Sequence, residues 1–303
     1  MCYSTDMAPY LSLSDQRRLE ISLPPSRIQT SIAAIDASLK DRITLLRNTN
    51  ATLEAIAQAL FKSWFVDFEP VRARQEGRAP DRMDEATVAL FPDSFEESAL
   101  GLVPRGWRVE SLDSVADFLN GLALQKSPAQ PGENWLPVIK IAQLRKGDAA
   151  GADRASRNIK AECVIEDGDV LFSWSGSLEV EVWCGGQGAL NQHLFKVAST
   201  QFPKWLYLRW TKQHLPNFQQ IAASKATTMG HIQRKHLTEA KVLVPPQPLV
   251  DWMSGVFTSL LEQSVSNSLQ ARNLTTLRDT LLPRLISGQL RLPEAGAAVE
   301  AAL

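Results

Sequence analysis

Apolar residues recur every seven positions in two separate stretches of the chain, and both stretches predict long helices. The first covers residues 24–68 and contains no proline after Pro25. A seven-residue apolar period indicates a helix that pairs with another helix along a coiled-coil seam. Its seam positions are Ile32, Leu39, Leu46, Leu53 and Leu60, with Ile28, Ile35 and Ile56 in the companion heptad position and Arg42 and Thr49 interrupting it.

The second stretch, residues 245–290, repeats the pattern of the first one 221 positions later. Its seam residues are Leu260, Leu274 and Leu281, with Asn267 as a polar break. A buried Asn can fix the register of a coiled coil at some cost in stability. Because each helix has one apolar stripe, an antiparallel pair within the chain is the simplest way to bury both stripes.

The segment between the two helices has the pattern of a mixed α/β domain. Stretches rich in Val, Ile, Phe and Trp predict strands at 135–144, 163–174, 180–184 and 193–199, and residues 203–223 have helical spacing. Residues 69–104 are acidic and punctuated by proline, which is typical of a linker, and residues 291–303 are expected to be a disordered tail. We therefore expect an α+β fold, with one mixed α/β domain at 105–244 flanked by two long helices that form an antiparallel coiled coil.

Composition and charge narrow the range of functions. The chain of 303 residues is 44% hydrophobic and 21% charged, which suits a soluble protein with a buried core. It has neither an apolar run that would span a membrane nor the start of a secretion signal, so we expect no membrane contact. Three widely spaced cysteines without a CxxC pair are typical of free thiols in a reducing cytoplasm, where we expect the protein to be located.

The net charge of −1 hides a basic segment. Residues 203–241 hold seven Lys or Arg against a single acid, together with three of the four histidines. A local excess of positive charge is what a binding site for a polyanion requires. A solvated helix face would show the same excess, so the charge alone leaves both interpretations open.

Three loops of the middle domain have the side chains for binding chemistry. Ser175 and Ser177, in "SWSGSLE", offer hydroxyl groups to phosphates or base edges, although a polar hairpin turn has the same composition. The second loop, "GGQGALNQH", ends at His193 and matches no nucleotide-binding fingerprint. The third, "SKATTMGHIQRKHL", is the most suggestive, although a charged surface loop would look similar. In this loop Lys225, Arg234 and Lys235 can neutralise phosphates, while Thr227, Thr228, His231 and Gln233 can hydrogen-bond base edges. Lys126 and Lys140 complete the candidate DNA-binding residues.

Catalytic interpretations lack the residues that they require. The histidines and cysteines do not have zinc-site spacing, and no GxSxG motif supports a serine hydrolase. The chain has no methyl-donor pocket motif, helicase motif or cluster of nuclease carboxylates. We therefore expect no catalytic residue and no metal site.

With these features in view, the chain resembles the specificity subunit of type I restriction-modification systems. The segments that carry the resemblance are "ALFKSWFVDFEPV", "LFPDSFEESALGLVPRGWRVESLDSVADFLNG", "DGDVLFSWSGSLEV", "ALNQHLFKV", "TTMGHIQRKHL" and "LRDTLLPRLISGQLRLP". The family pattern is recognition domain, helix, recognition domain, helix. Here the first recognition domain is missing, and residues 1–23 resemble only its last part.

The resemblance implies a non-catalytic subunit whose target-recognition domain reads one half of a bipartite site in double-stranded DNA. Methyltransferase subunits would dock on the helices, and restriction subunits would join through the complex. S-adenosylmethionine, ATP and Mg²⁺ would belong to those partners, so this chain is expected to bind no cofactor itself. A second specificity chain is a further expected partner. The alternatives are a coiled-coil interaction protein that has lost DNA binding through gene truncation, and a free-standing nuclease.

Overall fold

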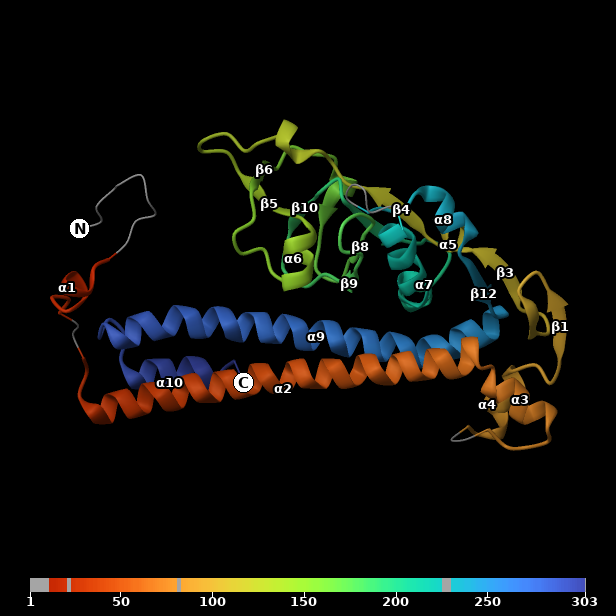
Figure 1. The fold of residues 1–303 in the computed structure, drawn as a ribbon. Helices are drawn as coiled ribbons and strands as arrows, with labels where there is room; N and C mark the ends of the chain where they lie inside the picture. The colour runs from red at the N-terminus through yellow and green to blue at the C-terminus, as the bar shows by residue number, and fades with distance from the viewer. Residues whose placement is uncertain (1–10, 21–22, 81–82, 225–229, 303) are drawn as a thin grey trace. The chain divides into compact units, whose positions relative to one another are not determined.

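The structure, a computed structural model, describes residues 11–20, 23–80, 83–224 and 230–302 and divides into two compact units. The smaller unit comprises Met1–Leu45 and Ala271–Leu303, and the larger unit comprises Leu46–Gln270. Two long helices, α2 (Ser26–Phe61) and α9 (Gln247–Ile286), contribute residues to both units (Figure 1). Long helices combined with mixed sheets confirm the predicted α+β class.

The smaller unit is helical and contains α1 (Leu13–Gln16), parts of α2 and α9, and α10 (Leu292–Glu300). The expectation of a disordered tail at 291–303 is wrong for residues 292–300. Alanine is the best helix former, and the spacing of Ala295 and Val299 places both on one face of α10, where both are buried. Among the described residues, the buried apolar side chains of this unit are Ile32, Leu39, Ile43, Ala271, Leu274, Leu281, Leu285, Ala295 and Val299.

In the larger unit, α2 and α9 run antiparallel and are joined by a polar pair. Asn267 is 5% exposed, and its side-chain amide donates to Asn50 Oδ1 at 2.9 Å. The Asn50 amide donates in turn to the Ser264 carbonyl and to Ser268 Oγ, both at 2.9 Å. Farther along α2 the partners come from earlier in α9: Phe61 contacts Phe257 with ring centroids 6.5 Å apart. The predicted polar break is therefore a satisfied hydrogen-bond network between the helices.

The buried stripe of α2 follows the 3.6-residue period of a straight helix and not the heptad column. An ideal helix drifts by about 20° per heptad relative to a seven-residue repeat. Accordingly Ile56, expected beside the seam, is 43% exposed, while its neighbour Ala57 is 3% exposed. Of the expected seam residues, Ile32, Leu39, Leu46, Leu274 and Leu281 are buried, whereas Leu53, Leu60 and Leu260 are half-buried.

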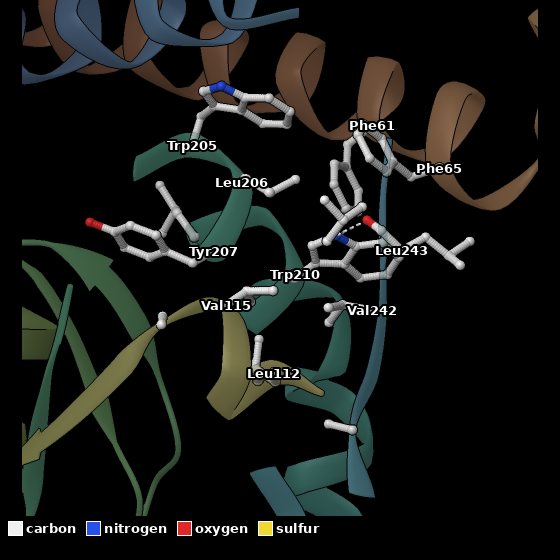
Figure 2. Close-up of a cluster of buried hydrophobic side chains, with 14 of the residues drawn as sticks. Phe61, Phe65, Leu112, Val115, Trp205, Leu206, Tyr207, Trp210, Val242 and Leu243 are labelled. Carbon is white, nitrogen blue, oxygen red and sulfur yellow. Dashed lines mark hydrogen bonds between the residues drawn. The ribbon is translucent and has the colours of Figure 1, made fainter. Parts of the chain in front are cut away.

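An aromatic cluster ends α2 and packs it into the mixed domain. Helix α2 continues as one π-helical turn, η1 (Lys62–Val66), which is a rare conformation in proteins. Phe61 stacks on Phe65 with ring centroids 4.6 Å apart and meets the edge of Trp210 at 5.0 Å. Figure 2 shows these rings with α7 (Lys204–Ser224), whose Trp210 donates its indole N–H to the Leu243 carbonyl at 3.1 Å.

The segment at 69–104, expected to be a linker, folds against this cluster. It forms the helices α3 (Glu69–Gln75) and α4 (Glu85–Leu90) and a hairpin of β1 (Phe95–Ser98) and β2 (Gly101–Pro104). Its apolar side chains Val71, Phe91 and Val103 are at most 2% exposed. The linker was predicted from the acidic and proline-rich composition, which does not reveal that a few widely spaced apolar side chains are buried.

The mixed domain is built from two four-stranded sheets and a two-stranded pair. One sheet has the order β6-β5-β10-β7, the second has the order β4-β11-β8-β9, and β12 pairs with β3. The strands are β3 (Arg108–Ser111), β4 (Asp117–Asn120), β5 (Trp135–Ile139), β6 (Arg154–Ser156), β7 (Val164–Ile165), β8 (Val170–Ser173), β9 (Val180–Val182), β10 (Gly188–Leu190), β11 (Leu194–Ala198) and β12 (Lys241–Val244). The short helices of the domain are α5 (Leu112–Val115), η2 (Leu124–Lys126), α6 (Ile141–Lys146), η3 (Ala161–Cys163) and α8 (Arg234–Glu239).

Candidate nucleic-acid interface

Three loops that lie far apart in the sequence meet at one surface of the mixed domain. They follow β8, connect β10 to β11, and precede α8. Ser175 and His231 form an isolated antiparallel bridge, and the Gly176 N–H donates to the Gly230 carbonyl at 2.8 Å. On the other side, the Trp174 N–H donates to the His193 carbonyl at 3.3 Å. Backbone hydrogen bonds thus hold all three loops together.

The side chains at this junction form a small polar cluster, which we call the Ser175–His193 cluster: Trp174, Ser175, Gln192, His193 and His231. Ser175 Oγ lies 2.9 Å from His193 Nδ1, and Gln192 Nε2 lies 3.3 Å from His193 Nε2. The Trp174 ring is 5.9 Å from the His193 ring and 6.3 Å from the His231 ring. Ser175 is 3% exposed, while both imidazoles are half-buried. The two histidines and Gln192 are therefore partly accessible at the surface.

The contact between serine and histidine does not have the arrangement of a hydrolase. His193 Nδ1 faces Ser175 Oγ, while His193 Nε2 faces the Gln192 side-chain amide and not a carboxylate. A nucleophilic serine requires an imidazole that accepts the hydroxyl proton and a carboxylate that orients the ring. The cluster is suited to hydrogen bonding and not to nucleophilic attack.

A close backbone approach at Gly230 positions the third loop. A Cβ atom at this residue would lie 2.4 Å from the Ala222 carbonyl oxygen of α7, so no larger residue fits without movement. A comparable approach occurs at Gly121, where a Cβ atom would lie 2.2 Å from the Asn191 carbonyl oxygen beside the second loop. Glycine at these two positions lets the loops pack directly on neighbouring backbone.

The basic candidates around α8 have different environments. Arg234 donates to the Phe118 carbonyl at 2.9 Å, and its guanidinium carbon lies 5.6 Å from the centre of the Phe195 ring. This side chain therefore braces α8 against the sheet while remaining exposed. Gln233 precedes the helix and Lys235 occupies its first turn, and both side chains are exposed. Lys225, Thr227 and Thr228 lie outside the described residues.

The remaining candidates do not join the Ser175–His193 cluster in the described contacts. Ser177 is exposed, and its carbonyl accepts a hydrogen bond from Ser173 Oγ at 2.7 Å. Lys140 forms an ion pair with Asp153, and Lys126 ends η2 with an exposed side chain. Two cluster members, Trp174 and Gln192, were missed by the sequence analysis. Their positions in the sequence could have indicated them, because Trp174 directly precedes Ser175 and Gln192 directly precedes His193.

A second polar site joins α7 to α2 within the larger unit. Arg209 is 8% exposed and binds Glu54 through both guanidinium nitrogens, at 2.8 and 2.6 Å, while Lys212 Nζ lies 3.0 Å from the same carboxylate. Burial alone would raise the pKa of Glu54, but the hydrogen bond from Arg209 and the charges of Lys212 and Arg209 lower this pKa to about 2. These groups line a cavity of 310 Å³ with Asn50, Cys184 and Ser264. Since its two cations, Arg209 and Lys212, are matched by the acids Glu54 and Glu181, we interpret it as the anchor of the mixed domain on the helix.

The described part of the chain lacks two other kinds of feature. No group of three or more His, Cys, Asp or Glu side chains is placed to hold a metal ion. No helix among these residues has the length and apolar content that crossing a membrane requires.

Comparison with known proteins gives a consistent set of relatives, although no protein-family model matches the chain. The specificity subunit of the type I restriction enzyme HindI from Haemophilus influenzae is 25% identical over 93% of this chain and 71% of its own length. The specificity subunit of the MjaIX enzyme from Methanocaldococcus jannaschii is 24% identical over 94% of this chain, which spans 64% of that protein. A solved type I S subunit from M. genitalium is 15% identical, with a TM-score of 0.48 over 94% of this chain and 67% of its own.

Proposed function

We propose that this chain, a homologue of the specificity subunits of type I restriction enzymes, selects the DNA sequence on which partner subunits act. Its mixed domain would read one half of a bipartite target in double-stranded DNA. The chain itself performs no catalysis in this proposal. We expect it to bind this DNA in the cytoplasm.

The observation that carries the proposal is the convergence of three polar loops on the Ser175–His193 cluster. Base edges are distinguished in the major groove by their pattern of hydrogen-bond donors and acceptors. Imidazole and amide groups held in place by backbone hydrogen bonds supply both donors and acceptors at fixed positions. His193 and His231 are held in this way, and Gln233 lies two residues beyond the Ser175–His231 bridge.

Phosphate contacts have a different role from base contacts. Lys235 is exposed on the first turn of α8, beside the loop that holds His231. Contacts of this kind fix the position of the protein on the duplex but do not carry sequence information. Their contribution falls as salt rises, because bound counterions are released from the DNA.

The long helices supply the second part of the proposal. We infer that methyltransferase subunits dock on α2 and α9, and that restriction subunits join through the complex. S-adenosylmethionine, ATP and Mg²⁺ would be bound by these partners. A second specificity chain would supply the other half of the bipartite target.

The test is to substitute His231 and Gln233 together by alanine and to sequence the methylated sites produced with the modification subunit. We expect the methylation motif to relax at specific positions, since each good base contact contributes about 1–3 kcal/mol of discrimination. Gln201→Ala, at an exposed turn after β11, is the matched control and should leave motif and level unchanged.

Two results would contradict the proposal. An unchanged motif and level in the His231→Ala/Gln233→Ala variant would remove these residues from base reading. An absence of any sequence enrichment by the wild-type complex in a random duplex library would instead indicate a helical interaction protein that has lost DNA binding.

A further inference from the structure

The exposed face of the β5–β6 edge carries an aromatic and cationic surface that is separate from the Ser175–His193 cluster. Strand β6 is the outer strand of its sheet and pairs with β5 so that Trp135 is opposite Ser156 and Pro137 is opposite Arg154. Successive side chains of a strand point to opposite faces. Leu136 and Ala155, at most 2% exposed, therefore face the core, while Trp135 is 42% exposed on the other face.

Arg154 is held on the Trp135 ring. Its guanidinium carbon lies 4.5 Å from the ring centre, which is within the range of a cation–π contact. In the described part of the chain, no carboxylate lies within ion-pair distance of Arg154. The side chain is thus fixed in place without its charge being neutralised.

Two further cations lie on the backbone segments next to β6. Arg157 directly follows the strand and donates to the neutral Gln187 side chain at 2.6 Å. Lys126 is brought close because the Ser156 N–H donates to the Ser127 carbonyl at 3.0 Å, and Pro128 forms a bridge with Ala155. Together, the segments that carry Trp135, Arg154, Arg157 and Lys126 make up the outer edge of this sheet, which we call the β5–β6 cationic face. Arg157 continues the strand opposite Asn134, so its side chain lies on the side of the strand opposite to Arg154.

Several exposed cations elsewhere on the domain are matched by acids, unlike Arg154. Examples are the pairs Lys140–Asp153 and Arg145–Glu179. The nearby acid, Glu133, accepts hydrogen bonds from the Gln130 N–H and from Ser156 Oγ, and these bonds lower its pKa. Glu133 therefore fixes the loop before β5 and is not an ion-pair partner of the arginines.

We propose that the β5–β6 cationic face is a second DNA contact, which binds the phosphate backbone of the duplex read by the Ser175–His193 cluster. The inference rests on the proposed function. Guanidinium groups bind phosphates with two parallel hydrogen bonds and are weakly hydrated, so an arginine already stacked on an aromatic ring loses little on binding. Strand β5 is paired with β10, which leads into the His193 loop. Two strand spacings and about four residues along β5 separate the sites by roughly 15 Å, less than one turn of a DNA duplex.

The test uses the complex of this chain with its modification subunit and the variant Arg154→Gln/Arg157→Gln. DNA binding is measured by fluorescence anisotropy between 50 and 300 mM salt, for a duplex with the methylated motif and for a scrambled duplex. We expect roughly a tenfold loss of affinity for both duplexes and a salt slope that is smaller by about 2, since each phosphate contact contributes about 1. Lys160→Gln, at an exposed lysine paired with Glu162, is the matched control and should change neither value.

The outcomes separate this inference from the proposed function. If the wild-type complex prefers the motif but the double variant binds with unchanged affinity and slope, the β5–β6 contact is wrong and the proposed function stands. A changed methylation motif in the variant would also contradict it, because backbone contacts do not read sequence. Failure of the wild-type complex to bind either duplex overturns both. An unchanged Tm in the double variant shows that any loss is not caused by unfolding.

Discussion

Glu54 offers a test of how the mixed domain is attached to the first long helix. The variant Glu54→Gln keeps the size of the side chain and one carbonyl oxygen but removes the charge that faces Arg209 and Lys212. Arg209 is 8% exposed, so the variant leaves a largely buried guanidinium without its counterion. Removing one partner of a buried ion pair destabilises a protein more than the pair itself contributes.

The size of the effect follows from the pKa of Glu54. Its pKa is about 2 in the folded chain against an ordinary value of 4.5, which corresponds to at most about 3 kcal/mol of stability at neutral pH. The side chain of Glu54 is 40% exposed, and solvent screening weakens such interactions. We therefore expect Glu54→Gln to lower the free energy of unfolding by about 1–2 kcal/mol at pH 7.

The dependence on pH gives the sharper measurement. Because the folded pKa is depressed, the carboxylate stabilises the fold above the unfolded pKa of 4.5, and this contribution is lost as pH falls towards 2. Urea unfolding of wild type and variant should show a difference that shrinks by roughly one third to one half between pH 7 and pH 3.5. Glu262→Gln, at an exposed glutamate of α9, is the matched control and should show no difference at either pH.

Either of two results would contradict this role of the Glu54 charge. One is a cost below about 0.3 kcal/mol at pH 7, the range expected for an ordinary surface substitution. The other is a cost that stays constant with pH, which would mean that the lost interaction does not depend on the charge of Glu54.

Two pairs of substitutions, each measured by urea unfolding, test packing features of the fold. Gly230→Ala should lower the free energy of unfolding by about 1–3 kcal/mol and weaken DNA binding, because the new Cβ would lie 2.4 Å from a backbone oxygen. Gly255→Ala on α9 meets open space and should raise the free energy of unfolding by about 0.5–1 kcal/mol. Equal effects of the two changes would contradict the close approach. Ile56→Ala should lower the free energy of unfolding by about 1 kcal/mol or less and Phe61→Ala by about 3–5 kcal/mol, since these side chains are 43% and 3% exposed. A larger loss for Ile56→Ala than for Phe61→Ala would mean that the heptad positions, and not the 3.6-residue stripe, are buried.

The long helices and the α+β class could be predicted from the sequence because apolar periodicity reports local structure directly. Which residues of the first helix are buried could not be predicted to the same accuracy. A heptad and a straight helix differ by only a tenth of a residue per turn, so the two patterns agree at Leu39 and Leu46 and diverge by Ile56. Beyond that point the aromatic rings of Phe61 and Phe65, packed into the mixed domain, determine which face of the helix is buried.

The structure of the segments 69–104 and 292–300 could not be predicted from the sequence for a different reason. Their composition was interpreted as a linker and a disordered tail, because acids, prolines and alanines dominate both. What holds the first segment is three apolar side chains spread over more than thirty residues, with Val71 and Phe91 at most 1% exposed. Such widely spaced anchors carry no periodic signal, and their effect depends on a partner surface that only the folded chain provides.

The candidate site shows why charge composition predicts a binding surface only in part. Asp153 and Arg154 are neighbours in the sequence, and from composition alone their charges cancel. In extended backbone, however, neighbouring side chains point in opposite directions. Asp153 therefore pairs with Lys140, one of the lysines that the sequence indicated for DNA binding, while Arg154 lies on Trp135 with its charge available. The strand register thus moves the accessible positive charge from a lysine that the sequence indicated to an arginine that it did not.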